Sequence, residues 1–268
     1  MNHHSLTKCI LLDHLPAVQA FIPVNLYERK QSKETILCRL AHPYTLWLKV
    51  TTMDQSPPAI REENQFLQLK YKITSWFYDI LDYPWERLYK KWRPRLLQDV
   101  RGSVLEAGVG TGRNLQHYHA SVDLTGIDLS ADMLNKAWKR SQKAHCQIHL
   151  SQEDATVMQS IPSNHFDWLV STFLCCVMPD HLQPLAIQQF ERILKPGGRF
   201  RLLEMLYSHD PKIRKRQDFF SPFVEKVYGA RFDRNTVGHV QESSILKITN
   251  TYFLKDDVYL VVEGICEK

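Results

Sequence analysis

A short loop rich in glycine carries the clearest chemical signal in the sequence. Residues 108–112 read Gly-Val-Gly-Thr-Gly, so glycine stands at every second position. Because glycine lacks a Cβ, such a loop turns sharply and lets a ligand approach the backbone closely. The dinucleotide-binding fingerprint places its third glycine one residue later, and this spacing departs from it. The loop therefore predicts a nucleotide-sized gap, with a tight turn between strand and helix as the alternative reading of the loop alone.

Three carboxylates surround this loop in the sequence, at Glu106, Asp128 and Asp154. Glu106 would repel a diphosphate but suits a ligand with a cationic amino group. Asp128 is placed to accept hydrogen bonds from both hydroxyls of a ribose, and Asp154 to meet the exocyclic amine of adenine. The set predicts a site for a cationic nucleoside. Taken singly, Asp128 could instead start a helix and Asp154 could be an ordinary exposed loop acid.

The elements that must position these residues alternate between β and α. Predicted strands at residues 103–106, 124–128 and 166–173 are followed by helices from about Asn114, at 131–143 and at 182–194. Residues 199–205, 245–253 and 258–264 predict further strands, the last two joined by a turn at 255–257. This order predicts an α/β fold, with a doubly wound, mostly parallel seven-stranded sheet and a C-terminal antiparallel hairpin.

The pattern divides the chain into three parts. Residues 1–60 show no sustained period and end in Ser-Pro-Pro at 56–58, which predicts an N-terminal extension. An arm, a small packed subdomain and a loosely ordered segment are all open for it. Residues 61–100 predict a helical cap, with one helix over 66–80 and a second from Pro84 to Pro94. Residues 101–268 form the expected binding domain.

Composition excludes several functional classes. The net charge is +5, and the basic residues are spread along the chain except for one cluster at 212–216. This charge is too small to predict nucleic-acid binding. The longest apolar run, at 168–178, is too short to cross a bilayer, and no secretory signal is recognised. Six cysteines lack the spacing of zinc sites, so we expect free thiols, no metal and a cytoplasmic protein.

Five motifs stand in order and carry a family resemblance. They are residues 104–114, 126–130 with Met133 and Leu134, 154–155, 166–170 and 194–198. Together they resemble the class I, Rossmann-like methyltransferases that use S-adenosyl-L-methionine. The resemblance is to the group that includes ubiquinone and menaquinone biosynthesis methyltransferases and bacterial phosphatidylethanolamine N-methyltransferases, and it covers about residues 75–264.

The resemblance implies a cofactor and its site. In this family the glycine loop wraps the methionine part of the cofactor, the acid after the second strand holds the ribose, and the Asp-Ala pair borders the adenine. Tyr78 resembles a tyrosine that lies near the cofactor. The predicted cofactor-binding residues are Tyr78, Glu106, Ala107, Gly108, Gly110, Thr111, Gly112, Asn114, Asp128, Leu129, Met133, Asp154, Ala155, Ser171 and Phe173.

Methyl transfer makes modest demands on the protein, because the sulfonium already carries an activated methyl group. An aligned acceptor and the exclusion of water are enough, so a dedicated base is not required. The candidate catalytic residues are Tyr78 and His181, of which His181 could act as a base or be a surface or capping residue. Phe173 could flank the adenine or the methyl group, or simply pack in the core. Cys175 and Cys176 lie in an apolar run that favours inert, neutral thiols.

The acceptor is predicted from the surroundings of the site. Aromatic residues over 66–92 would cover it, and the segment from Lys212 to Phe223 combines cations with phenylalanines. Such a segment suits an anionic amphiphile or peripheral membrane contact, or it forms an ordinary helix with a buried aromatic face. We expect methyl transfer to a small or lipid-like acceptor, a phospholipid amine or a quinone-precursor ring carbon. The alternatives are a soluble thiol, amine or hydroxyl metabolite, and a non-catalytic cofactor-binding or protein-interaction module.

Overall fold

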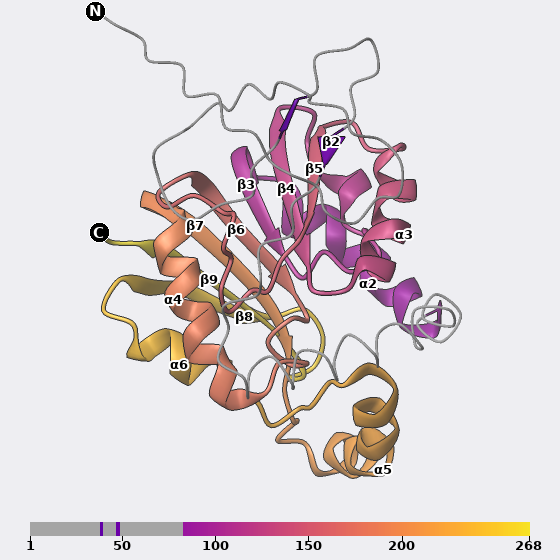
Figure 1. Cartoon of the computed structure of the whole chain (residues 1–268). Helices are drawn as coiled ribbons and strands as arrows, with labels where there is room; N and C mark the ends of the chain where they lie inside the picture. Colours follow the sequence, from indigo (N-terminus) through magenta and orange to yellow (C-terminus); the bar gives the residue numbers. More distant parts are fainter. Residues whose placement is uncertain (1–37, 40–46, 49–82) are drawn as a thin grey trace, which may run out of the picture. The chain divides into compact units, whose positions relative to one another are not determined.

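The computed structural model describes residues 38–39, 47–48 and 83–268 (Figure 1). The chain divides into two units, Met1–Ser56 and Pro57–Lys268. In the first unit, β1 (Cys38–Arg39) pairs antiparallel with β2 (Trp47–Leu48). The predicted helix over 66–80, with Tyr78, lies outside the described residues.

A seven-stranded sheet organises the second unit, in the order β5-β4-β3-β6-β7-β9-β8. Its strands are β3 (Gly102–Ala107), β4 (Val122–Asp128), β5 (Gln147–Gln152), β6 (Phe166–Thr172), β7 (Leu194–Met205), β8 (Leu246–Phe253) and β9 (Tyr259–Cys266). The first five strands in this order are parallel, and β9 runs antiparallel to both of its neighbours. The predicted α/β fold, with its mostly parallel sheet and C-terminal hairpin, is confirmed.

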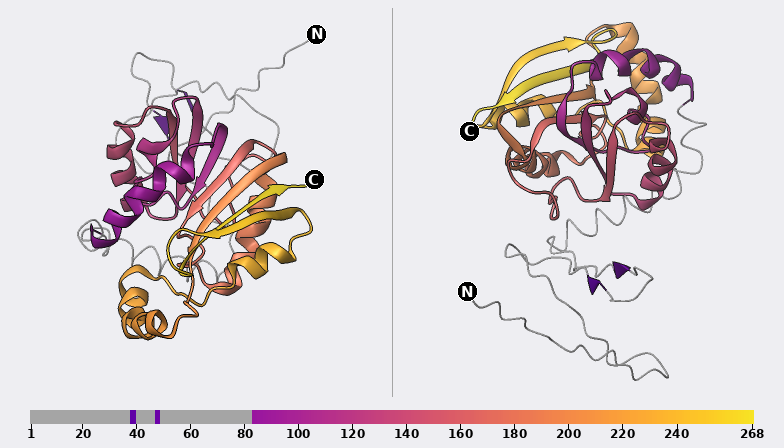
Figure 2. Two further views of the ribbon diagram at one scale, coloured as in Figure 1. Left: turned by 180° about the vertical axis from the view of Figure 1, so that it is seen from behind. Right: turned by 90° about the horizontal axis from the view of Figure 1, so that it is seen from above.

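Helices cover both faces of this sheet (Figures 1 and 2). The helical elements described in this unit are α2 (Tyr83–Leu97), η1 (Leu115–His117), α3 (Ala131–Ser141), η2 (Asp180–Leu182), α4 (Gln183–Ile193), α5 (Pro211–Tyr228) and α6 (Thr236–Glu242). Among the described residues, no helix has the length and apolar character needed to cross a membrane. Unlike the helices on the faces, α5 lies beyond the end of the sheet (Figure 1).

Two apolar clusters fill the space between sheet and helices, one on each face. Because side chains alternate along a strand, Val104 belongs to the cluster with Trp92 of α2, and Leu105 to the cluster with Phe190 of α4. All of these side chains are less than 9% exposed. The central strands β3 and β6 are buried on both faces along most of their length, as the centre of a doubly wound sheet requires, whereas the edge strands β5 and β8 are largely exposed or half-buried.

The structure corrects one predicted helix. Instead of a helix from about Asn114, the chain forms a single 3₁₀ turn at η1 before β4 begins. The side chains of Asn114 and Tyr118 turn inward to Glu106, and Leu115 is fully buried. These tertiary contacts outweigh the local helical preference.

Two boundaries also differ from the prediction. Helix α2 continues past Pro94 to Leu97, because Leu96 and Leu97 pack into the core while Pro94 stays exposed. Strand β7 begins at Leu194 rather than near residue 199. Its pairing with β6 is irregular between Phe166 and Trp168, which accommodates the Lys-Pro-Gly-Gly sequence.

Candidate functional site

A cavity of about 460 Å³ lies among the loops that follow β3, β4, β5 and β6, with α2, α5 and the turn between β8 and β9 completing its wall. This is where the carboxyl ends of parallel strands meet, the usual place for a ligand in such a sheet. The predicted residues that line the cavity are Glu106, Gly108, Gly110, Thr111, Asn114, Asp128, Leu129, Met133, Asp154, Ala155 and Phe173. Residues that are far apart in the sequence and were predicted separately therefore line one cavity.

The glycine loop adopts backbone angles that other residues avoid. Gly108, Gly110 and Gly112 have φ values of +73°, +55° and +79°. A Cβ on Gly110 would meet nothing nearer than 4.0 Å, whereas one on Gly112 would lie 2.7 Å from the Leu115 side chain and 2.8 Å from the Ala137 backbone. Gly110 thus leaves open space beside the loop, and Gly112 permits close packing against α3.

Asp128 ends β4 and faces the cavity. Its Oδ2 accepts a hydrogen bond from the Gly110 N–H at 2.8 Å, and its Oδ1 accepts one from the Ser130 N–H at 2.9 Å. Desolvation raises the pKa of Asp128 to about 6, against the two N–H bonds that lower it. Each oxygen keeps a second lone pair, so the carboxylate can accept two more donors. The cap of α3 is Ser130 rather than Asp128, because the Ser130 hydroxyl accepts from the Met133 N–H.

Glu106 is the centre of a buried chain of hydrogen bonds. Its Oε1 accepts from Asn114 Nδ2 at 2.7 Å, and its Oε2 accepts from the Tyr118 hydroxyl at 3.0 Å. Arg93 of α2 donates to Asn114 Oδ1 at 2.5 Å and pairs with Glu86 at 2.8 Å. Burial raises the pKa of Glu106 to about 7. Sequence analysis missed Arg93 and Tyr118, since no local motif links them to the glycine loop.

Asp154 has two tasks in the structure. Its Oδ1 accepts from both the backbone N–H and the hydroxyl of Thr156, at 2.8 and 2.7 Å, which closes its own turn. The same residue lines the cavity together with its neighbour Ala155. The pair therefore stands at the cavity edge in a conformation fixed by local hydrogen bonds.

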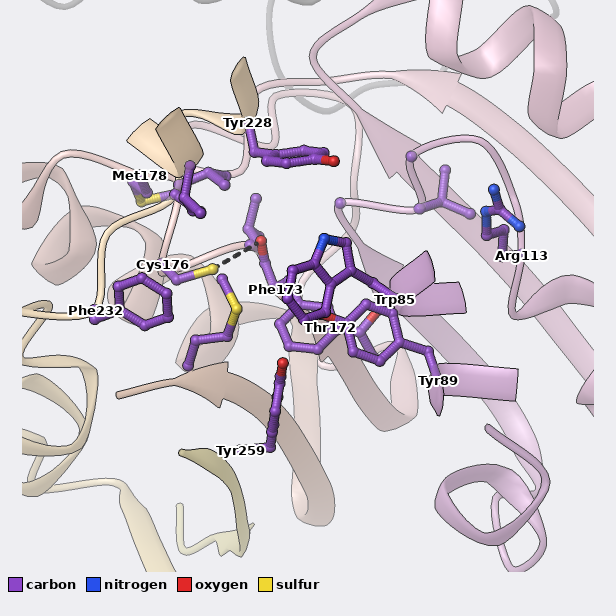
Figure 3. A pocket seen from close by; sticks show the side chains of 18 of the residues that line it. Trp85, Tyr89, Arg113, Thr172, Phe173, Cys176, Met178, Tyr228, Phe232 and Tyr259 are labelled. Atoms are coloured by element: carbon purple, nitrogen blue, oxygen red, sulfur yellow. Dashed lines mark hydrogen bonds between the residues drawn. The ribbon is translucent and has the colours of Figure 1, made fainter. Parts of the chain in front are cut away.

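Aromatic rings form the other wall of the cavity. Figure 3 shows Trp85 and Tyr89 of α2, Phe173 after β6, Tyr228 of α5 and Tyr259 of β9 around one space. The ring centroids of Tyr89 and Phe173 are 4.9 Å apart, and those of Tyr89 and Tyr259 are 5.9 Å apart. Tyr228 and Tyr259 were not predicted, because each lies far along the chain from the cofactor motifs.

Phe173 holds an unusual backbone conformation. Its φ is +61°, in the left-handed region that residues with a side chain rarely adopt. Its N–H donates to the Leu203 carbonyl at 2.8 Å, which fixes the backbone as β6 ends. Strain of this kind is found at functional sites, where the surrounding structure maintains it. Phe173 lines the cavity and also packs against Tyr89.

Four predicted residues do not line the cavity. Ala107 lies in the core, and Gly112 packs on α3. Strand alternation turns Ser171 into the core, where it is fully buried, and it is the next residue, Thr172, that lines the cavity. His181 is exposed in η2, just before α4, so its position gives no support to a role as base.

The cysteines near the site are buried. Burial raises the pKa of both the Cys175 and the Cys176 thiol well above the ordinary value. Cys146 and Cys266 are also free thiols. Neutral thiols are poor nucleophiles, so inertness is the physical expectation for Cys175 and Cys176.

Glu204 is a buried carboxylate that sequence analysis missed. It lies near the end of β7, is 2% exposed, and accepts the N–H groups of Cys175 and Cys176 at 3.0 and 2.7 Å. Desolvation raises its pKa to about 7. The Cys176 carbonyl in turn accepts the N–H of Arg231, in the segment between α5 and α6, at 2.9 Å. Glu204 therefore anchors the loop after β6.

Comparison with known proteins identifies the family. Residues 104–198 match the family described as a methyltransferase domain. The phosphatidylethanolamine N-methyltransferase of Cereibacter sphaeroides is 31% identical over 150 residues, which is 55% of this chain and 68% of that protein. The chain belongs to the S-adenosylmethionine-dependent methyltransferases. S-adenosyl-L-methionine is accordingly the cofactor of this methyltransferase.

Other relatives set the range of the comparison. A demethylmenaquinone methyltransferase of Staphylococcus haemolyticus is 28% identical over 155 residues. The match covers 55% of the present chain and 63% of that protein. The N-methyltransferase NodS of Bradyrhizobium japonicum has a TM-score of 0.52 at 17% identity, covering 70% of this chain and 99% of NodS. The [4+2]-cyclase SpnF has the same TM-score at 15% identity, covering 68% and 80%. Structural likeness therefore shows the fold and leaves the reaction to the site.

Proposed function

We propose that the chain transfers the methyl group of S-adenosyl-L-methionine to a small, lipid-like acceptor held against the aromatic wall. One observation carries the proposal: Glu106, Asp128 and Asp154 line the same cavity as the rings of Tyr89 and Phe173. The carboxylate wall suits a cationic nucleoside, and the aromatic wall suits an apolar acceptor.

The cofactor half of the cavity would bind S-adenosyl-L-methionine along the loops after β3, β4 and β5. Asp128 would accept both ribose hydroxyls with the lone pairs that Gly110 and Ser130 leave open. Glu106 and the glycine loop would face the methionine part, and Asp154 with Ala155 would border the adenine. The open space beside Gly110, which a Cβ would fill, supports close approach of the ligand to the backbone.

The chain's own contribution to the reaction is alignment and dehydration. S-adenosyl-L-methionine supplies an activated methyl group on a sulfonium, a cation that aromatic faces such as Tyr89 and Phe173 stabilise. The fixed, strained backbone of Phe173 orients that ring, and the apolar wall excludes water from the acceptor. No base is needed in this scheme, which agrees with the exposed position of His181. Tyr78 stays a candidate outside the described residues.

A lipid-like acceptor is supported by the composition of the wall and by the names of the relatives. The two curated relatives are named for a phospholipid amine and a demethylmenaquinone. Besides the rings labelled in Figure 3, Phe232 among them, the acceptor side contains Met205, Phe220 and Val224. We propose a phospholipid amine or a quinone-precursor ring carbon as the acceptor, with a soluble thiol, amine or hydroxyl metabolite as the alternative.

We also propose peripheral membrane contact through one flank of α5. Lys212, Lys215, Phe219 and Phe223 follow one another at three- and four-residue intervals and share this flank. Phe219 is 78% exposed and Phe223 is 50% exposed. The two acidic residues of α5 do not neutralise these lysines, because each pairs with an arginine: Asp218 with Arg214, and Glu225 with Arg231. Cations beside exposed phenylalanines are the composition of helices that lie on anionic lipid.

Vesicle binding tests this contact. The chain is expected to sediment with phosphatidylglycerol vesicles but not with phosphatidylcholine vesicles, and salt should weaken the binding. Replacing Lys212 and Lys215 by Gln should lower binding about 30-fold, at roughly 1 kcal/mol for each of the two cations near the surface. Replacing Lys139 and Lys143, which are exposed near the end of α3, serves as the control. If both double variants lose the same amount of vesicle binding, the proposal that α5 makes the membrane contact is contradicted.

Calorimetric titration tests the central proposal. S-adenosyl-L-methionine and S-adenosyl-L-homocysteine are both expected to bind the purified protein with micromolar dissociation constants, because the cofactor half contacts groups that the two ligands share. Acceptor screening would follow with amphiphiles before soluble metabolites. A folded sample that binds neither ligand would contradict the proposed enzyme and favour the non-catalytic module.

A further inference from the structure

Arg216 occupies the border between two faces of α5. It lies three residues after Ile213 and four before Phe220, and all three line the cavity. The same spacing rule makes it a neighbour of Lys212 and Phe219 on the outer flank. Arg216 is exposed, so its guanidinium is accessible from the cavity and from solvent. A ligand that enters the cavity past α5 would meet this side chain.

The charge of Arg216 is not neutralised by a neighbour. Across residues 83–268 no carboxylate forms an ion pair with it, although Arg93 pairs with Glu86 and Arg214 pairs with Asp218. An arginine stays charged at all physiological pH values and presents a planar set of donors that matches an oxyanion. An arginine without an acidic partner at a ligand cavity therefore points to an acidic group on the ligand.

The surroundings of Arg216 define the rest of that ligand. Ile213, Phe220 and Val224 bring apolar surface to the same stretch of the cavity wall. The nearby turn between β8 and β9 contributes two charged residues to the cavity wall, Lys255 and Asp256, which are adjacent and of opposite sign. The third charged residue of this turn, Asp257, does not line the cavity and accepts hydrogen bonds from Ser208 and His209. A free inorganic anion would gain nothing from the apolar surface, whereas an amphiphile would use both features.

Resting on the proposed methyl transfer, we infer that Arg216 binds the acidic oxyanion group of an amphiphilic acceptor whose apolar part lies against the aromatic wall. This assigns the substrate class as anionic amphiphiles. It also makes Arg216 a specificity-determining residue that acts at the acceptor end and not on the cofactor.

A matched pair of probes tests the inference on the full chain. Octyl phosphate and uncharged octyl glucoside, both below their micelle-forming concentrations, are titrated into protein saturated with S-adenosyl-L-homocysteine. Octyl phosphate is expected to bind more tightly than octyl glucoside and than inorganic phosphate. Arg216→Gln should weaken octyl phosphate binding about tenfold, as expected for one exposed charge-assisted contact. Arg216→Lys, which keeps a point charge, should fall between Gln and the natural residue.

Controls separate this inference from the proposed function. Arg87→Gln, which removes an exposed arginine of α2 outside the cavity wall, should leave octyl phosphate binding unchanged. Titration of S-adenosyl-L-homocysteine alone reports the cofactor half in every variant and should not respond to Arg216→Gln. If the cofactor product binds but Arg216→Gln leaves octyl phosphate affinity unchanged, or weakens octyl glucoside equally, the inference is overturned while the cofactor site stands. Equal binding of inorganic phosphate would also overturn it.

Discussion

Asp128→Ala is expected to weaken binding of S-adenosyl-L-homocysteine by roughly 2–4 kcal/mol, which is about 30- to 1000-fold. The substitution removes the proposed acceptor for two ribose hydroxyls. It also releases the N–H groups of Gly110 and Ser130, so part of the loss comes from a looser glycine loop. Isothermal titration of the variant at pH 7.5 measures the effect.

The pH dependence gives an independent check on Asp128. Because the pKa of this carboxyl is raised to about 6, it is charged at pH 7.5 and becomes protonated as the pH falls below about 6. Protonation converts one acceptor oxygen into a donor, so affinity for the cofactor product should decline over that range. Asp123→Asn, an exposed acid of the same strand, is the control. A folded Asp128→Ala protein with unchanged affinity would remove the ribose assignment.

Glu204→Ala is expected to destabilise the fold by roughly 2–6 kcal/mol, because it leaves two buried N–H groups without an acceptor at about 1–3 kcal/mol each. The affected groups belong to Cys175 and Cys176. Urea unfolding followed by far-ultraviolet circular dichroism measures the loss. Glu267→Gln, an exposed carboxylate after β9, should change stability little. If Glu204→Ala unfolds at the same urea concentration as the unsubstituted protein, the hydrogen bonds of Glu204 contribute nothing to stability.

Glu204→Gln probes the charge rather than the anchor. The ordinary pKa of 4.5 is raised to about 7, so between these values the folded chain holds a proton that the unfolded chain has released. Stability contributed by this group is therefore highest below pH 4.5 and decreases as the pH rises towards 7, by about 3 kcal/mol in all. The Gln variant should lack this part of the pH dependence. Unfolding at pH 5.5 and 8 compares the two proteins, and parallel curves would contradict the raised pKa.

Local signals explain why the cofactor half could be predicted from the sequence. The glycine loop follows β3 directly, Asp128 is the last residue of β4, and Asp154 lies two residues after β5. Parallel strands bring their carboxyl ends to one edge of the sheet. The residue types, together with their positions at strand ends, were therefore enough to predict that these residues line one site. The same logic failed for Ser171, because strand alternation decides which of two neighbouring side chains faces the cavity.

The residues on the proposed acceptor side of the cavity could not be predicted from local sequence signals. Tyr228 and Tyr259 come from separate elements, and their meeting depends on how α5 and β9 pack. The turn at η1 shows the same limit, because side-chain bonds to Glu106 replaced the helix that the local pattern favoured. Tertiary hydrogen bonds between distant residues leave no period in the sequence.

The placement of α5 bears on how this protein can diversify. The helix starts at Asp210, whose carboxylate accepts the N–H groups of Lys212 and Ile213, and it ends at Gly229 in a left-handed conformation. Gln217 joins it to the end of β7 through Ser208 and Leu206. The cofactor loops come from other strands, so one continuous segment can be exchanged between these fixed ends. With the acceptor held against α5 as proposed, acceptor preference could evolve by replacement of this segment, while the cofactor-binding loops are inherited unchanged.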